Sequence, residues 1–176
     1  MLNYPLWFGI LHGFTDADNA GKNVIYPGAS NRKRSLIDTE ASRIAVKANF
    51  KDHTVLGTFV DNHDHRRFLN INPDIPTFKH AMTFILFTEG IPIIYYGSEQ
   101  AYNMGGDPES RQAMFADFKQ DSDIYKYLTI AIGVRKTNKV HSKPTYFDYL
   151  THLGLGLEEP GHCQCRSVPV WIRQIQ

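Results

Sequence analysis

Carboxylate, amide and imidazole groups gather directly after one short apolar segment of this chain. The apolar run 55–60 ends at residues 61–65, which read Asp-Asn-His-Asp-His. A short apolar run bounded by polar residues is typical of a buried strand. Parallel α/β folds carry their chemistry at the carboxyl ends of their strands. We therefore expect this cluster to lie at the functional edge of a sheet.

The same cluster suggests a metal-dependent hydrolase, because it holds two carboxylates and two imidazoles. These side chains belong to Asp61, His63, Asp64 and His65. Neighbouring residues of a strand point to opposite faces, however, so the four groups cannot all converge on one ion. The other histidines are dispersed and form no second cluster with the spacing of metal ligands. A measurement of bound zinc or manganese in the purified protein tests whether it is a metal-dependent hydrolase.

Helical and strand patterns alternate around the cluster. Apolar positions 37, 41, 44, 45 and 48 predict a helix with one apolar face before the run 55–60. The clearest helix starts near Pro76, carries an apolar stripe at 78, 81, 82, 85 and 86, and stops at Gly90. The apolar run 91–96 then predicts a second strand, and residues 97–106 predict a loop.

Further elements extend this pattern at both ends. We expect residues 2–4 to end a strand, Asp107 and Pro108 to begin a short helix, and residues 123–136 to form the last helix. Strand and helix in alternation are the βα pattern of a parallel sheet, so the predicted fold class is α/β. After residue 138 the periodicity decays. The Gly154-Leu-Gly156 motif there follows no predicted strand, which argues against a dinucleotide site.

Composition and charge narrow the choice of partners. The chain has 176 residues, 42% of them hydrophobic and 21% charged, with a formal net charge of +1. This balance predicts no nucleic-acid partner and no membrane partner. The apolar runs stay below the roughly 18 residues that suggest a membrane span, and we expect no signal peptide at residues 1–5. Cys163 and Cys165 are too close for an ordinary disulfide and supply only half of a typical zinc set.

Four stretches of the chain, taken together, resemble the α-amylase family of glycoside hydrolases, especially the secreted fungal type. The stretch 56–64 resembles the fourth signature region of the family, and 90–100 resembles its eighth barrel strand. Order and spacing agree as well, and the resemblance covers roughly residues 1–136. The four stretches read LNYP (2–5), LGTFVDNHD (56–64), GIPIIYYGSEQ (90–100) and GGDPESR (105–111).

The resemblance implies a (β/α)8 TIM barrel with its site on the carboxyl-terminal face of the strands. The chain begins at what resembles the sixth strand, so residues 1–138 correspond to about the last three βα units of a partial barrel. Residues 139–176 form a tail that does not match the family. Catalysis needs a nucleophile and an acid/base carboxylate, which in the family follow the fourth and fifth strands. Both are absent here, with most calcium ligands, so we expect a catalytically incomplete fragment without a cofactor.

The resemblance assigns roles to four residues. Asp64 matches the third family carboxylate, a transition-state stabiliser, and His63 matches the sugar-binding histidine beside it. Asp107 and Arg111 match a pair that holds a glucose outside the cleavage subsite, as acceptor and donor for adjacent hydroxyls. Two structural alternatives stay open. In the first, the polar side chains after the strand only end the strand and bond to backbone groups, as we expect for Asp61. In the second, Asp107 only caps the amino terminus of a short helix.

The predicted function is that of an α-amylase-like glycoside hydrolase acting on α-1,4-glucans such as starch, glycogen and maltooligosaccharides. An extracellular location follows from the same resemblance. Two alternatives remain, a non-catalytic carbohydrate-binding remnant and an incomplete copy with no function of its own. A partial barrel leaves the edges of its outer strands unpaired. We therefore expect self-association through these edges, beside binding of an α-glucan.

Overall fold

A computed structural model describes residues 1–15, 36–114 and 118–140 of the chain. The predicted tail from residue 141 onward, with both cysteines, lies outside the described residues. The helices are α1 (Tyr4–Phe14), α3 (Leu36–Asn49), α4 (Phe68–Ile71), α5 (Ile75–Phe87) and α6 (Asp123–Thr137), and the strands are β1 (Gly57–Phe59) and β2 (Ile91–Ile93). Single 3₁₀ turns occur at η1 (His53–Val55), η2 (Ser98–Gln100) and η3 (Glu109–Arg111).

The strands form a small parallel sheet in the predicted order. Gly57 of β1 pairs with Ile91 of β2, and Leu2 joins the other side of β1 through a single parallel bridge to Gly57. The predicted first strand is therefore limited to one bridge. It ends there because the Asn3 side chain accepts a hydrogen bond from the Leu6 N–H and so caps α1, which already begins at Tyr4.

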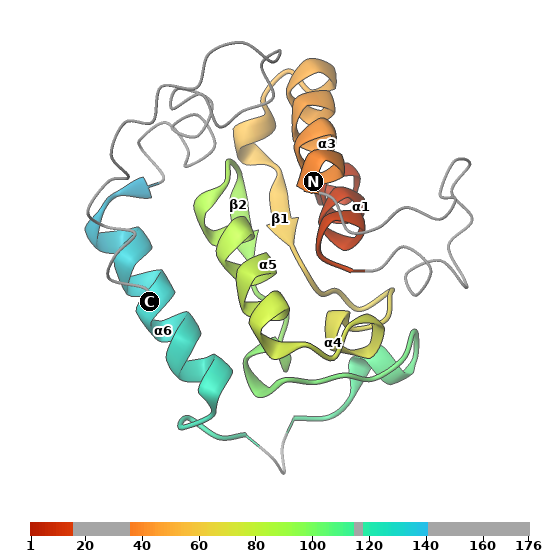
Figure 1. Cartoon of the computed structure of the whole chain (residues 1–176), viewed down its shortest axis with the longest axis vertical. Coiled ribbons are helices and arrows are strands. Elements are labelled where there is room, and N and C mark those ends of the chain that lie inside the picture. Colours follow the sequence, from red (N-terminus) through yellow and green to blue (C-terminus); the bar gives the residue numbers. More distant parts are fainter. Residues whose placement is uncertain (16–35, 115–117, 141–176) are drawn as a thin grey trace.

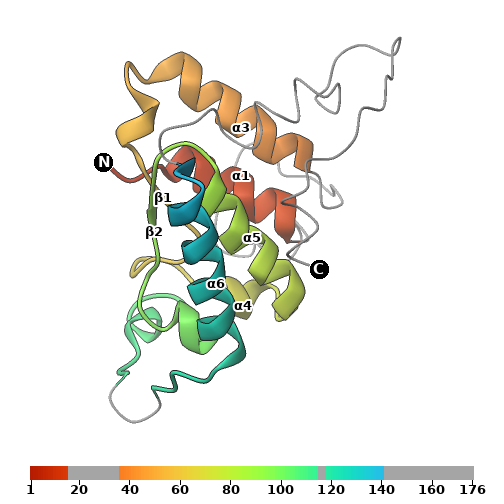
Figure 2. The same ribbon diagram turned by 90° about the vertical axis from the view of Figure 1, so that its left-hand side faces the viewer.

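The large helices all lie on one side of this sheet (Figure 2). Helix α5 connects β1 to β2 and packs against α6, while α1 packs against α3 (Figure 1). On the other side, apolar side chains of the sheet are left open to solvent. Leu2 is 37% exposed, Ile91 56% and Ile93 38%. The described part of the chain is thus a sheet with helices on one face only.

The predicted apolar stripe of α5 and the predicted last helix, which is α6, are confirmed. Each residue of the α5 stripe is at most 2% exposed, and Asp74 caps the helix by accepting from the Thr77 N–H. On α6, Ile124, Leu128 and Ala131 are buried, and Ser122 provides the cap. Burial of these side chains in the apolar core stabilises the fold, at about 25 cal/mol for each Å² of apolar surface removed from water.

The predicted apolar face of α3 is wrong. Ile44 is 55% exposed, and Ala41, Ala45 and Ala48 are exposed as well. The face that packs holds Thr39, Arg43 and Val46 instead. Thr39 Oγ1 donates to the Gly9 carbonyl at 2.8 Å, and a Cβ on Gly9 would lie 2.5 Å from Ser42 Oγ. This close approach of α1 and α3 requires small side chains, and that requirement overrides the apolar pattern.

Both strands are shorter than their apolar runs. Val55 is 55% exposed and belongs to the turn η1, which Asp52 caps by accepting from the Thr54 N–H. The prediction of a strand from Val55 is therefore wrong by two residues. At the other end, β2 stops at Ile93, and Ile94 to Tyr96 continue as irregular chain. Within the three described ranges, no helix is long and apolar enough to cross a membrane.

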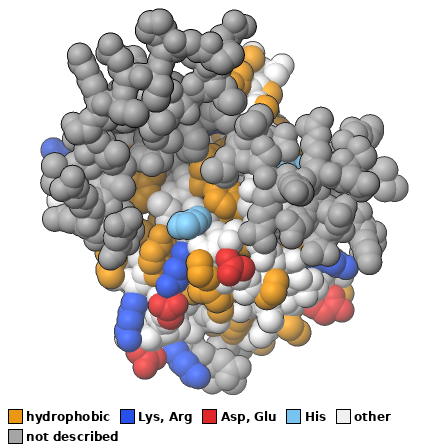
Figure 3. All heavy atoms as spheres, in the orientation of Figure 1, with side chains coloured by type: hydrophobic (Ala, Val, Ile, Leu, Met, Phe, Trp, Pro, Cys, Tyr) orange, Lys and Arg blue, Asp and Glu red, His pale blue; other side chains and the backbone are white. Residues whose placement is uncertain are grey.

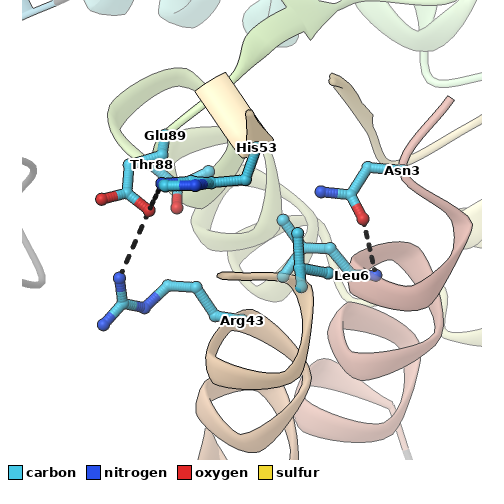
Figure 4. A pocket seen from close by; sticks show the side chains of 7 residues that line it. Asn3, Leu6, Arg43, His53, Thr88 and Glu89 are labelled. Carbon is cyan, nitrogen blue, oxygen red and sulfur yellow. Dashed lines mark hydrogen bonds and ion pairs between the residues drawn. The ribbon is translucent and has the colours of Figure 1, made fainter. Parts of the chain in front are cut away.

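A charged cluster at the amino-terminal end of the sheet ties α3 to the turn before β2. The Glu89 carboxylate lies 2.6 Å from Lys47 Nζ, 3.5 Å from Arg43 Nη1 and 3.3 Å from His53 Nε2. Figure 4 shows Arg43 and His53 on either side of a small pocket beside Glu89. Because Arg43 is only 6% exposed, this carboxylate helps to offset the cost of burying its charge.

Candidate functional site

The polar cluster after β1 and the long loop after β2 meet at the carboxyl-terminal end of the sheet. Ser98 Oγ donates to Asp61 Oδ2 at 2.7 Å. Farther along the same loop, Ser110 Oγ and Arg111 Nε donate to the His63 carbonyl at 2.7 and 3.3 Å. The segments 61–65 and 97–111 therefore lie side by side, below the strands in Figure 1. The expectation that the cluster lies at the carboxyl-terminal edge of a sheet is confirmed.

The Asp64 carboxylate is held by groups from three parts of the chain. The Tyr4 hydroxyl donates to Oδ2 at 3.0 Å, and His63 Nε2 lies 3.2 Å from Oδ1. Asn62 fixes the loop itself, because its Oδ1 accepts from the backbone N–H groups of Asp64 and His65. The Asp64 side chain remains 47% exposed. A carboxylate oriented in this way keeps acceptor capacity for hydroxyl groups of a ligand.

Asp107 and Arg111 complete the cluster. Arg111 Nε lies 3.2 Å from Asp107 Oδ1, and Arg111 Nη2 lies 3.9 Å from Asp64 Oδ1. The structure therefore brings all four residues of the predicted site together, with His63 beside Asp64. The predicted N-cap role of Asp107 is wrong, because Pro108 holds the cap position of η3 and no side chain caps this turn. The Asp107 carboxylate faces Arg111 instead.

Asp61 has a different environment from the cluster that follows it. It is 3% exposed, and its Oδ1 accepts from the Phe68 N–H at 2.7 Å while Oδ2 accepts from Ser98. Burial raises the pKa of the Asp61 carboxyl, against the lowering effect of both hydrogen bonds and of Arg67. Asp61 is thus a structural residue that joins the two loops. Its carboxylate is used internally, so it does not converge with Asp64 on one ion.

Arg67 is a residue of the site region that sequence reasoning missed. Its guanidinium is fully buried and lies over the ring of Tyr95, with its Cζ 4.2 Å from the centroid, and near Tyr96 and Tyr102 at 5.3 and 5.8 Å. Cation–π attraction at such distances stabilises a buried cation. The three tyrosines therefore pack around Arg67. The sequence shows two adjacent arginines here, and nothing in it tells which of them is buried.

Helix α1 supplies the second group of missed residues. The indole of Trp7 stacks on the His65 ring, with centroids 4.5 Å apart and an interplanar angle of 30°, and its Nε1 donates to the Val60 carbonyl. Burial lowers the pKa of the His65 imidazole, partly opposed by the charge of Asp64. Burial and the bond to Asp64 raise the pKa of Tyr4, which keeps its hydroxyl a donor. In the sequence, the aromatic residues Tyr4, Trp7 and Phe8 were the only sign that this helix contributes side chains to the site.

The cluster opens onto a cleft of about 630 Å³ that Asp64 and Asp107 help to line. Such a volume lies within the range of small-molecule sites, about 300–1,000 Å³. On the face of the molecule in Figure 3, acidic and basic side chains of the described residues are interspersed, without a patch of one sign. Among the residues that the structure describes, no group of three or more His, Cys, Asp or Glu side chains is placed to hold a metal ion.

The position of the cluster indicates the class of protein. Parallel α/β proteins gather polar side chains from successive loops at the carboxyl ends of their strands, and they bind ligands there. The family model of the alpha amylase catalytic domain matches residues 26–129. The chain therefore belongs to the α-amylase family of glycoside hydrolases.

Individual relatives agree with this assignment. Alpha-amylase 1 of Schwanniomyces occidentalis is 34% identical over 128 residues, which are 72% of this chain and 22% of that protein. The alpha-amylase of Saccharomycopsis fibuligera is 32% identical over 134 residues, or 76% of this chain and 24% of that protein. An α-amylase structure from Malbranchea cinnamomea superposes with a TM-score of 0.66 at 26% identity, over 78% of this chain and 26% of its own. The chain thus spans about a quarter of the length of these relatives.

We expect Asp61→Ala to lower the free energy of unfolding by roughly 3–5 kcal/mol, because it leaves the buried Arg67 charge and the Ser98 hydroxyl without their partner. Urea unfolding followed by circular dichroism measures this loss. The exposed Asp121→Ala is the matched control, with an expected change within about 0.5 kcal/mol. Equal effects of the two substitutions would contradict the structural role of Asp61.

Asp61→Asn tests the electrostatic part of the same role. The pKa of Asp61 is raised above 3.8 in the folded chain, so the folded state binds more protons than the unfolded state between these two values. Stability of the wild type therefore falls as the pH rises from about 3.8 through the folded pKa. Asparagine does not ionise, so we expect the stability of the variant relative to wild type to increase over this window. If the difference in unfolding free energy between wild type and variant did not change with pH, ionisation of Asp61 would not destabilise the folded state.

Proposed function

We propose that this chain is part of an α-amylase-like glycoside hydrolase acting on α-1,4-glucans such as starch, glycogen and maltooligosaccharides. The observation that carries the proposal is the convergence of His63, Asp64, Asp107 and Arg111 at one end of a parallel sheet. The similar α-amylase of Geobacillus thermoleovorans, with a TM-score of 0.62 and 28% identity, was solved in complex with acarbose. The same likeness supports a partial (β/α)8 barrel of about three βα units.

In this proposal Asp64 is the transition-state stabiliser. Its carboxylate accepts hydrogen bonds from sugar hydroxyls at the cleavage point, and these bonds strengthen as the ring takes on oxocarbenium character. The Tyr4 hydroxyl orients the carboxylate from the α1 side, and His63 donates to a neighbouring hydroxyl. Asp107 and Arg111 hold a glucose unit away from the cleaved bond. Their ion pair orients an acceptor and a donor toward adjacent hydroxyls of that unit.

The chemical step itself needs two further groups. A retaining glycosidase uses a nucleophile and an acid/base carboxylate about 5–5.5 Å apart, on either side of the scissile bond. Asp61 is turned into the protein and bonded there, and Asp107 is paired with Arg111. We therefore assign neither catalytic role to these two carboxylates.

A non-catalytic carbohydrate-binding role is the second candidate. It is favoured by the half-exposed state of the cluster, in which Asp64 and Arg111 are 47% and 50% exposed. Such a chain binds an α-glucan and has no turnover under any condition. An activity assay distinguishes the two candidates when this chain forms part of a complete barrel that has the nucleophile and the acid. The glycoside hydrolase then hydrolyses the glucan, and the carbohydrate-binding remnant does not.

The first functional prediction is that the chain alone does not hydrolyse starch, because one oriented carboxylate cannot act on both sides of the anomeric carbon. A chromogenic maltooligosaccharide assayed with purified chain measures this directly. Asp64→Asn serves as the control. Turnover by the wild type that is lost in the variant would show that the missing carboxylates are replaced from within the chain.

In a complete α-amylase barrel that carries this segment, we expect Asp64→Asn to lower kcat by roughly 10²–10³-fold with little change in ground-state binding. The substitution keeps the shape of the side chain but removes the charge that faces the developing oxocarbenium. Asp107→Ala should instead raise KM for long glucans, since it lies away from the cleaved bond. Losses confined to KM in both variants would mean that the two roles are assigned wrongly.

Self-association of the isolated chain is the third part of the proposal. The open face of the sheet carries the exposed apolar side chains of Leu2, Ile91 and Ile93. The outer strands also have unpaired backbone groups at their edges, which favour pairing with another chain. We expect concentration-dependent oligomers in sedimentation velocity, and fewer of them for Ile91→Lys. The exposed Ile130→Lys on α6, on the opposite side of the sheet, is the matched control. A monodisperse wild-type monomer with a cooperative thermal transition would contradict this part.

A further inference from the structure

The small pocket at the amino-terminal end of the sheet is separate from the polar cluster, and the proposed function gives it no role. It lies where the start of α1, helix α3, the turn η1 and the residues after α5 come together (Figure 4). Leu6 and Val46 provide its apolar lining, and the other side chains that line it are polar. The pocket therefore presents hydrogen-bonding groups from several separate parts of the chain.

Thr88 is the lining residue whose hydrogen bonding is incomplete. It is 3% exposed, and its Oγ1 has no hydrogen-bond partner in the part of the chain that the structure describes. A buried hydroxyl without a partner destabilises the folded state. Native proteins satisfy such a group with an ordered water molecule where there is room for one and where further polar groups bind it. The surroundings of Thr88 therefore decide whether this pocket is a water site.

Asn3 and Glu89 provide the further polar groups. Asn3 Oδ1 accepts from the Leu6 N–H at 3.1 Å, so the amide nitrogen of the same side chain is directed toward the pocket (Figure 4). The Glu89 carboxylate lies 3.5 Å from Arg43 Nη1, and each carboxylate oxygen can accept more than one hydrogen bond. A ligand in the pocket thus finds a donor in Asn3, an acceptor in Glu89 and a group of either kind in Thr88.

The size and the charge of the pocket restrict its ligand. The pocket has a volume of about 10 Å³, and one water molecule needs roughly 10–15 Å³. A sugar or a polyatomic ion is therefore too large. Arg43 and Glu89 bring opposite charges to the lining, so a neutral molecule is favoured over an ion of either sign. Water has the required size, carries no charge, and both donates and accepts hydrogen bonds.

We propose that this pocket binds one structural water molecule, which accepts from the Asn3 amide, donates to the Glu89 carboxylate and shares a hydrogen bond with the Thr88 hydroxyl. The water joins the start of α1 to the turn between α5 and β2. Asn3 also caps α1, so the water holds this cap against the turn. The inference goes beyond the proposed function and does not depend on it, because the pocket lies at the opposite end of the sheet from the polar cluster.

Thr88→Val tests the proposal through the sign of a stability change, measured by urea unfolding of the full chain. Valine removes one partner of the water, so we expect the equilibrium constant for folding to fall about tenfold, equivalent to roughly 1.4 kcal/mol. If the hydroxyl has no partner at all, valine instead removes an unsatisfied buried group and stabilises the protein. Thr39→Val is the matched control, because Thr39 is 1% exposed and loses its bond to the Gly9 carbonyl in either case. Unchanged or increased stability of Thr88→Val overturns the inference.

NMR of the full chain detects the water directly. We expect a cross-peak between a long-lived water and the side-chain amide protons of Asn3 in wild type. Thr88→Ser retains the hydroxyl and should keep this cross-peak, whereas Thr88→Val should lose it. Absence of the cross-peak in wild type overturns the inference, and so does its persistence in Thr88→Val. A shift of the Asn3 amide signals when sodium chloride is replaced by sodium gluconate would identify a chloride ion and overturn the choice of water.

Discussion

The buried carboxylate of Asp61 is the interaction on which the geometry of the site depends. It accepts hydrogen bonds from the Phe68 N–H and the Ser98 hydroxyl, and it is the nearest anion to the buried Arg67. Through these bonds the end of β1 and the loop after β2 are fixed against each other. An isolated buried carboxylate is costly unless it is hydrogen-bonded and paired. That cost makes the arrangement specific, because any displacement of the loops leaves a charge unsatisfied.

The bonds around the buried Asp61 also determine where the exposed side chains of the cluster lie. Asp61 faces inward while Asn62 turns the chain, so that His63 and Asp64 face outward over the next loop. The His63 carbonyl then receives Ser110 and Arg111 from that loop. The His63 and Asp64 side chains are about half exposed. They are oriented by their backbone, by Tyr4 and by Arg111, and they keep donor and acceptor capacity toward solvent.

The one-sided cover of the sheet is the other constraint on this chain. Helices α1 and α5 pack on one face of the sheet, and α6 packs against α5 on the same side (Figure 2). Ile91 and Ile93 on the other face remain partly in contact with water. Parallel sheets are found almost entirely with both faces covered. The described part of the chain therefore carries its polar cluster at the end of an apolar sheet that still has surface to bury.

The sequence by itself determined the α/β pattern, the apolar stripe of α5, the last helix, the family, and the identity of the four clustered residues. These features are local, because helical period, capping and ordered motifs depend on residues near one another in the chain. Tertiary structure decided the rest. Gly9 and Thr39 set the packing of α3, against its apolar pattern, because two helix backbones approach closely there. The burial of Arg67 rather than Arg66, the bond from Tyr4 to Asp64, and the pairing of Asp107 with Arg111 are contacts through space. No local pattern specifies such contacts, because each depends on where another segment of the chain comes to lie.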